Sequence, residues 1–372
     1  MRRELRKLHL VRLDKGGIMP KLLTETKHFQ AASQIRELVN TLSPGEVLPV
    51  ASELMETLNI SHGTAMRALK VLADEGVIVR PMGKLRYRIA ERFERVSARI
   101  SMVRPDFPSS DLDGMVQSVY EAGKKRNWKF NQYCFRKSDE VDFTRIMGEA
   151  DAMVLIPTAE FISEELIRAL LKPERPVAVL LQHLRHPGIN NVCINDFRVG
   201  ELAAETLFER GHRRILFVKD QPDETTMAER YRGFSAAAER FGIPCGGEWF
   251  LDTHIHAFED GRENCYRALS ELIGRKKPEF TAVFCASMMG GVAALRAVRE
   301  QGLAVPDDIA VLAFGGESDL APYLYPPLSC IEIHYELFGE YAARLLEAAL
   351  SPEPSEPHRF TIEPRLVLRE SI

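Results

Sequence analysis

The chain has 372 residues, of which 45% are apolar and 27% charged. This length suits two or three domains with buried cores, and the composition excludes a disordered or fibrous protein. No apolar run approaches the ~18 residues of a membrane span, and Glu4, His9 and Arg12 interrupt the basic start, which argues against a secretory signal. Six cysteines without a Cys-x-x-Cys pair indicate reduced thiols rather than a disulfide framework. We therefore expect a cytoplasmic protein.

Charge is distributed unevenly along the chain. Residues 1–99 hold 18 Lys and Arg against 11 Asp and Glu, whereas residues 100–372 hold 31 against 42. A small basic segment joined to a large acidic one suggests an anionic polymer as the partner of the first segment. Residues 1–26 form a basic N-terminal extension, either a disordered arm or the product of an upstream start, with Met19 as an alternative initiator.

The segment 27–89 predicts three helices followed by a hairpin. Helical spacing of apolar residues predicts a helix over residues 28–42, a second one after Pro49, and a third one after Ser61, whose hydroxyl can cap it. Gly76 ends the third helix, and residues 77–90 then predict two short strands around a turn at residues 82–84.

This arrangement is that of a winged helix, which places one helix in the major groove of DNA and the hairpin against its backbone. Hydroxyl groups, small residues and cations at the start and outer face of the third helix suit phosphates and base edges, and the hairpin adds further cations. The candidate DNA-binding residues are Ser61, His62, Gly63, Thr64, Arg67, Lys70, Arg80, Lys84 and Arg86.

The run PGEVLPVASELMETLNISHGTAMRALKVLADEGVIV resembles the winged helix-turn-helix of GntR-type regulators. The matching positions are Pro44, Gly45, Leu48, Pro49, Leu54, Ser61, Thr64, Arg67, Ala68, Leu69, Leu72 and Gly76. The chain departs from the family at Ser52, His62 and Met66, where or near which GntR-type proteins carry arginines. The resemblance therefore implies DNA binding but leaves the family's common operator in doubt.

From residue 99 the chain alternates apolar strands with amphipathic helices, which is typical of α/β proteins with parallel sheets. We expect strands within residues 99–105, 128–135, 151–157, 176–182, 191–196, 214–220, 281–287 and 309–315, and helices over 110–126, 198–210, 229–241, 261–274, 289–301 and 336–350. Gly211 is expected to end its helix in a left-handed conformation. Ligands of such sheets bind beyond the carboxyl ends of the strands.

The runs INDFRVGELAAETLFERGHRRILFV, RYRGFSAAAERFGI, TAVFCASMMGGVAALRAVREQGLAVPDDIAVLAFG and PPLSCIEIHYELFGEYAARLLEAAL resemble the effector domain of LacI-type repressors, which is similar to periplasmic sugar-binding proteins. The resemblance covers residues 99–372 and implies two α/β lobes crossed by three hinge strands, a small ligand in the cleft and dimerisation along the lobes. Residues 90–98 are the linker to the winged helix.

The resemblance also implies candidate effector-binding residues, namely Arg230, Gln182, Asp196, Thr158, Ser287 and Met288. Two of them have an alternative role: Arg230 can form an interlobe salt bridge, and Asp196 can cap the helix that follows it. Met288 stands where the family has a sugar-binding aspartate, and residues 314–317 replace its G-[FY]-D-D motif. These departures argue against a monosaccharide effector and favour a less hydroxylated ligand, or a cleft that responds to none.

We expect no enzyme, cofactor or metal site, because the sequence lacks G-x-S-x-G, Walker A and H-E-x-x-H motifs and metal-ligand spacing. The predicted function is a transcriptional regulator, expected to be a repressor, that binds a palindromic double-stranded operator as a homodimer and a small, sugar-like or otherwise polar effector between the lobes. The alternative is a small-molecule binding protein with little specific DNA binding. Neither function needs a membrane.

Overall fold

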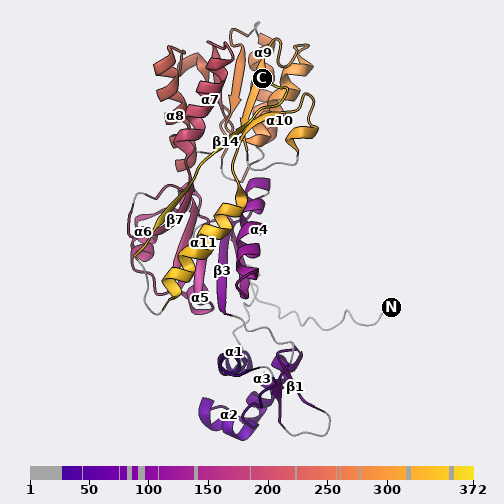
Figure 1. Ribbon diagram of the computed structural model, residues 1–372, viewed down its shortest axis with the longest axis vertical. Helices are drawn as coiled ribbons and strands as arrows, with labels where there is room; N and C mark the ends of the chain where they lie inside the picture. Colours follow the sequence, from indigo (N-terminus) through magenta and orange to yellow (C-terminus); the bar gives the residue numbers. More distant parts are fainter. Residues whose placement is uncertain are drawn as a thin grey trace, which may run out of the picture. The chain divides into compact units, whose positions relative to one another are not determined.

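The computed structural model describes residues 27–43, 45–74, 76–81, 86–90, 97–107, 109–137, 141–184, 186–222, 224–256, 258–259, 261–275, 278–315, 320–351 and 356–372. The chain divides into a small unit, residues 1–95, and a large unit, residues 96–372 (Figure 1). The predicted N-terminal extension, the hairpin turn with Lys84, and most of the predicted linker lie outside the described residues. Of that linker, Ala98 is the first residue of a strand.

The small unit has the predicted order of helices and strands: α1 (Lys27–Thr41), α2 (Ala51–Leu58), α3 (His62–Asp74), β1 (Ile78–Val79) and β2 (Arg88–Ile89). The strands pair antiparallel, with Ile78 opposite Ile89, and both side chains enter the core. The helices close this core with Ile35, Leu54 and Leu69, which are almost completely buried. The unit is therefore a three-helix core with a short hairpin at its end.

The large unit contains two lobes, each built on a six-stranded sheet. The first sheet has the order β13-β7-β6-β5-β3-β4 and the second has the order β14-β12-β11-β10-β8-β9. The named strand pairs are parallel, apart from the antiparallel pair β12–β14. The predicted α/β class with two lobes and parallel sheets is confirmed.

The first lobe comprises β3 (Ala98–Pro105), α4 (Ser110–Lys124), β4 (Trp128–Phe135), α5 (Phe143–Gly148), β5 (Ala152–Leu155), η2 (Ala159–Phe161), α6 (Glu164–Leu171), β6 (Val177–Leu181), β7 (Asn190–Ile194), α11 (Tyr335–Leu350) and β13 (Arg359–Ile362). The second lobe comprises α7 (Asp196–Glu209), β8 (Ile215–Lys219), α8 (Thr225–Phe241), η3 (Gly247–Trp249), β9 (Phe250–Asp252), α9 (Gly261–Arg275), β10 (Ala282–Cys285), α10 (Met288–Glu300), β11 (Ala310–Phe314), η4 (Ala321–Tyr323), β12 (Ser329–Glu332) and β14 (Arg365–Val367). Among the described helices, none has the length and apolar character to cross a membrane.

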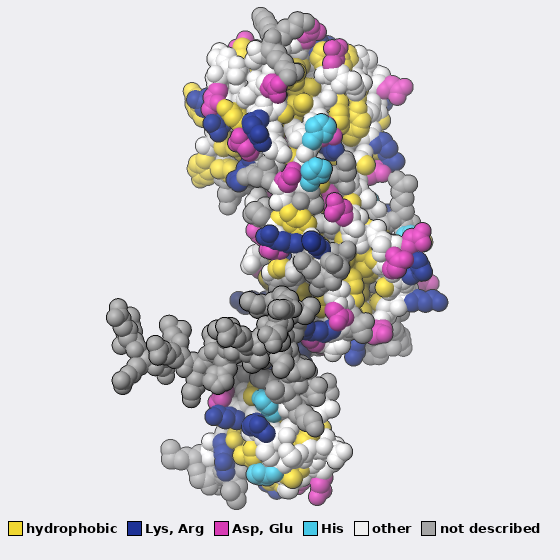
Figure 2. Space-filling model, turned by 180° about the vertical axis from the view of Figure 1, so that it is seen from behind, with side chains coloured by type: hydrophobic (Ala, Val, Ile, Leu, Met, Phe, Trp, Pro, Cys, Tyr) yellow, Lys and Arg dark blue, Asp and Glu magenta, His cyan; other side chains and the backbone are white. Residues whose placement is uncertain are grey.

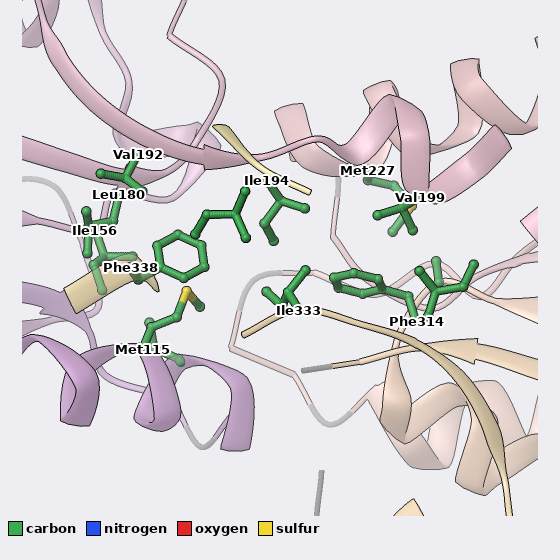
Figure 3. Close-up of a cluster of buried hydrophobic side chains, with 14 of the residues drawn as sticks. Met115, Ile156, Leu180, Val192, Ile194, Val199, Met227, Phe314, Ile333 and Phe338 are labelled. Carbon is green, nitrogen blue, oxygen red and sulfur yellow. The ribbon is translucent and has the colours of Figure 1, made fainter. Parts of the chain in front are cut away.

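The chain crosses between the lobes between β7 and α7, between β12 and α11, and between β13 and β14. One buried apolar cluster continues through these crossings. Figure 3 shows Ile194 and Ile333, which stand at two of them, between the first-lobe residue Phe338 and the second-lobe residues Val199 and Phe314. The lobes thus share a continuous core at the hinge, which suits the three hinge strands that the resemblance implies.

The eight predicted strands and six predicted helices are present, within a few residues of their expected ends. The expected left-handed conformation of Gly211 is also found, with φ 91°. The short helices α5 and α6 and the strands β9, β12, β13 and β14 were not predicted from the sequence. β13 has four residues and β14 has three, and most of their side chains are partly exposed. Both strands lie near the C-terminus and join sheets whose other strands come earlier in the chain.

Candidate functional site

The start of α3 is fixed by two hydroxyl groups. Ser61 accepts a hydrogen bond from the Thr64 N–H at 3.3 Å, and the two hydroxyl oxygens lie 2.9 Å apart. Ser61 is therefore the predicted cap of this helix, and it remains exposed. Thr64 is buried, with 8% of its surface exposed, so its side chain shapes the helix start and is poorly placed to contact DNA.

The outer face of α3 carries exposed residues of the kinds that contact DNA. His62, Gly63, Arg67 and Lys70 are all exposed there, while Ala65, Ala68, Leu69 and Leu72 turn into the core. Arg67 Nε donates to the Gly63 carbonyl oxygen at 3.0 Å, which holds the guanidinium along the first turn of the helix. This placement leaves Arg67 and Lys70 available to a phosphate or a base edge.

The hairpin adds two further predicted residues. Arg80 and Arg86 are both exposed, and the Arg80 guanidinium lies 5.8 Å from the centre of the Tyr87 ring. In Figure 2, Lys, Arg and His side chains are visible on the surface of the small unit. The described part of the small unit thus combines an exposed basic helix with a basic hairpin, which is the pattern of a winged-helix DNA interface.

In the large unit, the start of α8 holds the first lobe through its side chains. Glu224 Oε2 accepts hydrogen bonds from the Ala159 N–H at 2.6 Å and from Gln182 Nε2 at 2.7 Å. The Thr225 hydroxyl donates to Gln182 Oε1 at 2.6 Å and accepts from the His183 N–H at 2.9 Å. These four hydrogen bonds join the loops that follow β5 and β6 to the second lobe, and we call them the interlobe clasp.

Beside the clasp, a buried carboxylate joins two cationic side chains. Asp196 Oδ1 lies 2.5 Å from Arg230 Nη2, and Asp196 Oδ2 lies 2.9 Å from His183 Nε2. Arg230 also donates to the Ala286 carbonyl oxygen and lies over the Phe314 ring at 3.7 Å. Asn195, and not Asp196, caps α7 by accepting from the Arg198 N–H, so the alternative capping role of Asp196 is wrong.

Asp196 has a direct effect on the charge of His183. Burial lowers the pKa of an imidazole, but here the hydrogen bond and negative charge of Asp196 outweigh burial, with a contribution from Cys193, and raise the pKa of His183 to about 9. His183 is therefore an imidazolium at neutral pH that donates to Asp196. The group carries two positive charges around one buried carboxylate.

A second buried carboxylate lies at the start of α10. Asp220 Oδ2 accepts from the Ser287 hydroxyl at 2.7 Å, and Oδ1 is buried without a hydrogen-bond partner in the described part of the chain. Burial raises the pKa of Asp220 to about 7, although the Ser287 hydrogen bond and the Arg230 charge lower it. Gly290 packs closely against this carboxylate, because a Cβ at Gly290 would lie 1.5 Å from Asp220 Oδ2.

The structure brings most of the predicted effector residues to the facing ends of the two lobes. Gln182 belongs to the interlobe clasp, and Thr158 directly precedes Ala159, whose N–H donates in that clasp. Asp196 pairs with Arg230. Ser287 caps α10 by accepting from the Gly290 N–H at 3.1 Å. Met288 is buried next to Gly315, within van der Waals reach. Glu317, in the replaced family motif, lies outside the described residues.

Four residues of this region were not predicted from the sequence: His183, Asp220, Glu224 and Thr225. Asp220 is the last residue of the predicted strand at residues 214–220, and this position at the carboxyl end of a strand was the available signal. His183 follows another predicted strand, but a lone loop histidine is usually only polar. In the part of the chain that the structure describes, no group of three or more His, Cys, Asp or Glu residues could hold a metal ion.

Comparisons with known proteins distinguish the two units. Residues 29–84 match the model of bacterial regulatory proteins of the gntR family, and residues 204–372 match the periplasmic binding protein-like domain. The chain thus joins a segment similar to the gntR family model to a segment similar to the periplasmic binding protein-like domain. The two predicted resemblances are thus supported over these residues.

Relatives with similar sequences are transcriptional regulators by name. The chain is 32% identical over 197 residues to the HTH-type transcriptional regulator CelR of Thermobifida fusca, a match that covers 53% of this chain and 54% of CelR. It is 26% identical over 232 residues to the HTH-type transcriptional repressor PurR of Photobacterium profundum, a match that covers 62% of this chain and 67% of that protein. The chain thus spans about half the length of CelR.

Solved structures support the two-lobed fold. A complex described as transcriptional regulator CelR with cellobiose has a TM-score of 0.62 and 24% identity, and the match covers 84% of this chain and 91% of that chain. The Escherichia coli transcriptional repressor ascG has a TM-score of 0.64 and 19% identity, with 74% of this chain and 99% of that chain covered. At these identities the likeness concerns the fold.

Proposed function

We propose that this chain is a DNA-binding transcriptional regulator that responds to a small molecule bound between the lobes of its large unit. The observation that carries this proposal is the union of a gntR-family domain, with Arg67 and Lys70 exposed on α3, and a two-lobed binding fold. A transport-associated binding protein has no use for the first unit, whereas a regulator uses both. Such a protein acts in the cytoplasm, where the DNA is.

We further propose that the regulator is a homodimer on a palindromic operator. One winged helix contacts too few bases to distinguish an operator from the rest of a genome, so two half-sites are needed. The large unit would then set the spacing of the two winged helices. A ligand that prefers one lobe arrangement changes operator affinity by the same coupling free energy with which DNA changes ligand affinity. We expect the ligand to release a repressor.

The predicted ligand-contacting residues are Gln182 and Arg230, with Thr158, Asp196, Ser287 and Met288 around them. Arg230 already has a carboxylate partner in Asp196, a carbonyl partner and an aromatic neighbour. A guanidinium has five N–H donors, so it can hold Asp196 and still present an N–H to a polar ligand. Its salt bridge to Asp196 joins two helices of the second lobe, α7 and α8, so the alternative interlobe salt bridge is not found, and contact with the ligand remains its proposed role.

The test is an unbiased selection of DNA sequences by the purified full-length chain at two salt concentrations. Recovery of a palindrome, with affinity that falls steeply as salt rises, supports a dimeric regulator. Weak binding without sequence preference would overturn the proposal. It would favour the small-molecule binding protein, consistent with the absence of arginine at Ser52, His62 and Met66.

A further inference from the structure

Glu224 holds an unusual position for an acidic residue at the start of a helix. It occupies the N-cap position of α8 in the second lobe, where a carboxylate normally interacts with its own helix. Its Oε2 instead accepts from two first-lobe donors, the Ala159 N–H at 2.6 Å and Gln182 Nε2 at 2.7 Å. The first lobe therefore contains a binding site for one carboxylate, and a side chain of the second lobe fills it.

Hydrogen bonds within the first lobe hold the loop that carries Gln182. Asn191 Nδ2 donates to the carbonyl oxygens of Gln182 and Val179, at 3.1 and 3.0 Å, which anchors the loop after β6. Gln182 itself is buried, with 2% of its surface exposed. The other donor is a backbone N–H at the start of η2, in the loop after β5. The backbone that carries Gln182 is therefore held by the first lobe itself and not by Glu224.

The charges around the clasp favour an anionic occupant. Asp196 is shared between His183 and Arg230, so these three residues together carry one excess positive charge. The Glu224 carboxylate, which binds the residue next to His183, offsets this excess. Asp220, with a pKa of about 7 and an electrostatic interaction with Arg230, offsets part of this excess; a neutral occupant would leave the remainder in a partly buried region, whereas another carboxylate would keep the balance.

We propose that the Ala159 N–H and Gln182 Nε2 form a carboxylate subsite, that Glu224 fills it within the chain, and that the effector is a small carboxylate-bearing molecule that displaces Glu224. This inference rests on the proposed function and names the chemical class of its ligand. Displacement removes two of the four hydrogen bonds of the interlobe clasp. Ligand binding is thereby coupled to the contact between the lobes.

The subsite is tested by emptying it and offering acetate as the probe. Glu224→Ser removes the carboxylate while Ser retains the ability to cap α8, so the helix start is preserved. In the full-length chain, sodium acetate is expected to raise the thermal midpoint of this variant by a few degrees, saturably, relative to sodium chloride at equal ionic strength. The unmodified chain, whose subsite is filled, is expected to respond equally to the two salts.

Three further variants make the test specific. Glu248→Ala removes an exposed carboxylate of the second lobe and should leave the two salts equivalent. Glu224→Gln keeps an acceptor in the subsite and should suppress the acetate effect, as should Gln182→Ala combined with Glu224→Ser. An acetate effect in Glu224→Ser no larger than in Glu248→Ala would overturn the proposal, as would an effect that survives loss of Gln182.

Failure of the subsite and failure of the proposed function give different results. Acetate stabilisation is measured without DNA, so it can occur in a chain that lacks operator specificity. Conversely, a chain that selects a palindrome but whose Glu224→Ser variant ignores acetate keeps its role as a regulator and loses only the carboxylate class of effector.

Discussion

Asp196 Oδ1 lies 2.5 Å from Arg230 Nη2, and the two side chains expose only 0% and 6% of their surface. The pair connects the first turn of α7 to the middle of α8, and the same carboxylate contacts His183 of the first lobe. A buried pair of this kind adds little net stability over an apolar pair, but loss of one partner leaves the other charge buried and uncompensated.

Asp196→Asn is therefore expected to lower the free energy of unfolding of the large unit by about 3–5 kcal/mol. Urea unfolding followed by circular dichroism measures this loss. Glu164→Gln is the matched control, because Glu164 and Arg168 form an exposed pair at 3.4 Å whose loss should cost at most about 1 kcal/mol. Equal losses in the two variants would contradict the structural role of Asp196.

His183 gives stability that depends on pH. Its pKa is raised from 6.5 to about 9 in the folded chain, so its contribution is complete below pH 6.5 and is lost as pH rises towards 9. In the unmodified chain, the free energy of unfolding should therefore fall by an amount on the order of 2–3 kcal/mol over this pH range, and His183→Gln should abolish this fall. Thermal midpoints of both proteins across the range measure the difference. His254→Gln, which changes an imidazole with 85% of its side chain exposed, should follow the unmodified chain.

Asp220 also lowers the stability of the folded chain as pH rises, but over a more acidic range than His183 does. Burial raises the pKa of this carboxyl from 3.8 to about 7, so the folded chain binds a proton that the unfolded chain has released. Stability should therefore decrease as pH rises from about 4 to about 7, and Asp220→Asn should remove this decrease. Urea midpoints at several pH values check it. An unchanged slope in Asp220→Asn, or an equal change in the exposed control Asp307→Asn, would argue against the titration of Asp220.

The packing of α7 on α8 depends on two glycines. A Cβ at Gly233 would lie 1.8 Å from the Phe197 carbonyl oxygen, and one at Gly200 would lie 1.9 Å from the Arg230 carbonyl oxygen. Because these contacts involve backbone atoms, Gly233→Ala should destabilise the large unit by about 1–3 kcal/mol or more. Gly148→Ala, at the end of α5 with no atom within 4 Å of its Cβ, should be nearly neutral. Parallel denaturant curves distinguish the two.

The exposed face of α3 is expected to provide DNA affinity. Arg67→Ala should weaken binding to the selected operator by about 1–3 kcal/mol and relax its sequence preference, while Lys70→Ala should reduce the salt slope by about 1. Fluorescence anisotropy against specific and scrambled duplexes measures both effects. Lys124→Ala, an exposed lysine of the large unit, is the control and should bind as the unmodified chain does.

Much of the fold could be predicted because apolar periodicity is strong in the buried strands and amphipathic helices. β8 before Lys219 and all of β10 are buried apolar runs, and the strands were expected from that feature. β13 and β14 could not be expected, because a strand of three or four half-exposed residues has no clear period and gains its stability from a partner strand distant in sequence.

The candidate site was less predictable, for a related reason. Gln182 follows from its position at the end of a strand and from the family resemblance, and Arg230 follows from the family resemblance alone. Glu224 has no local signal, because its partner Gln182 is 42 residues away and in the other lobe. Thr64 was expected to reach DNA because it lies at the start of α3, yet the helical period turns it inward against Ser61.

A small molecule bound by the large unit is expected to change DNA binding by the small unit. The most direct measurement is an anisotropy titration of the selected operator with the full-length chain, repeated with each small metabolite that raises the chain's thermal midpoint. Such a compound is expected to change operator affinity, and the operator is expected to change affinity for the compound by the same factor. Operator affinity unchanged by every compound that binds the large unit would contradict this expectation.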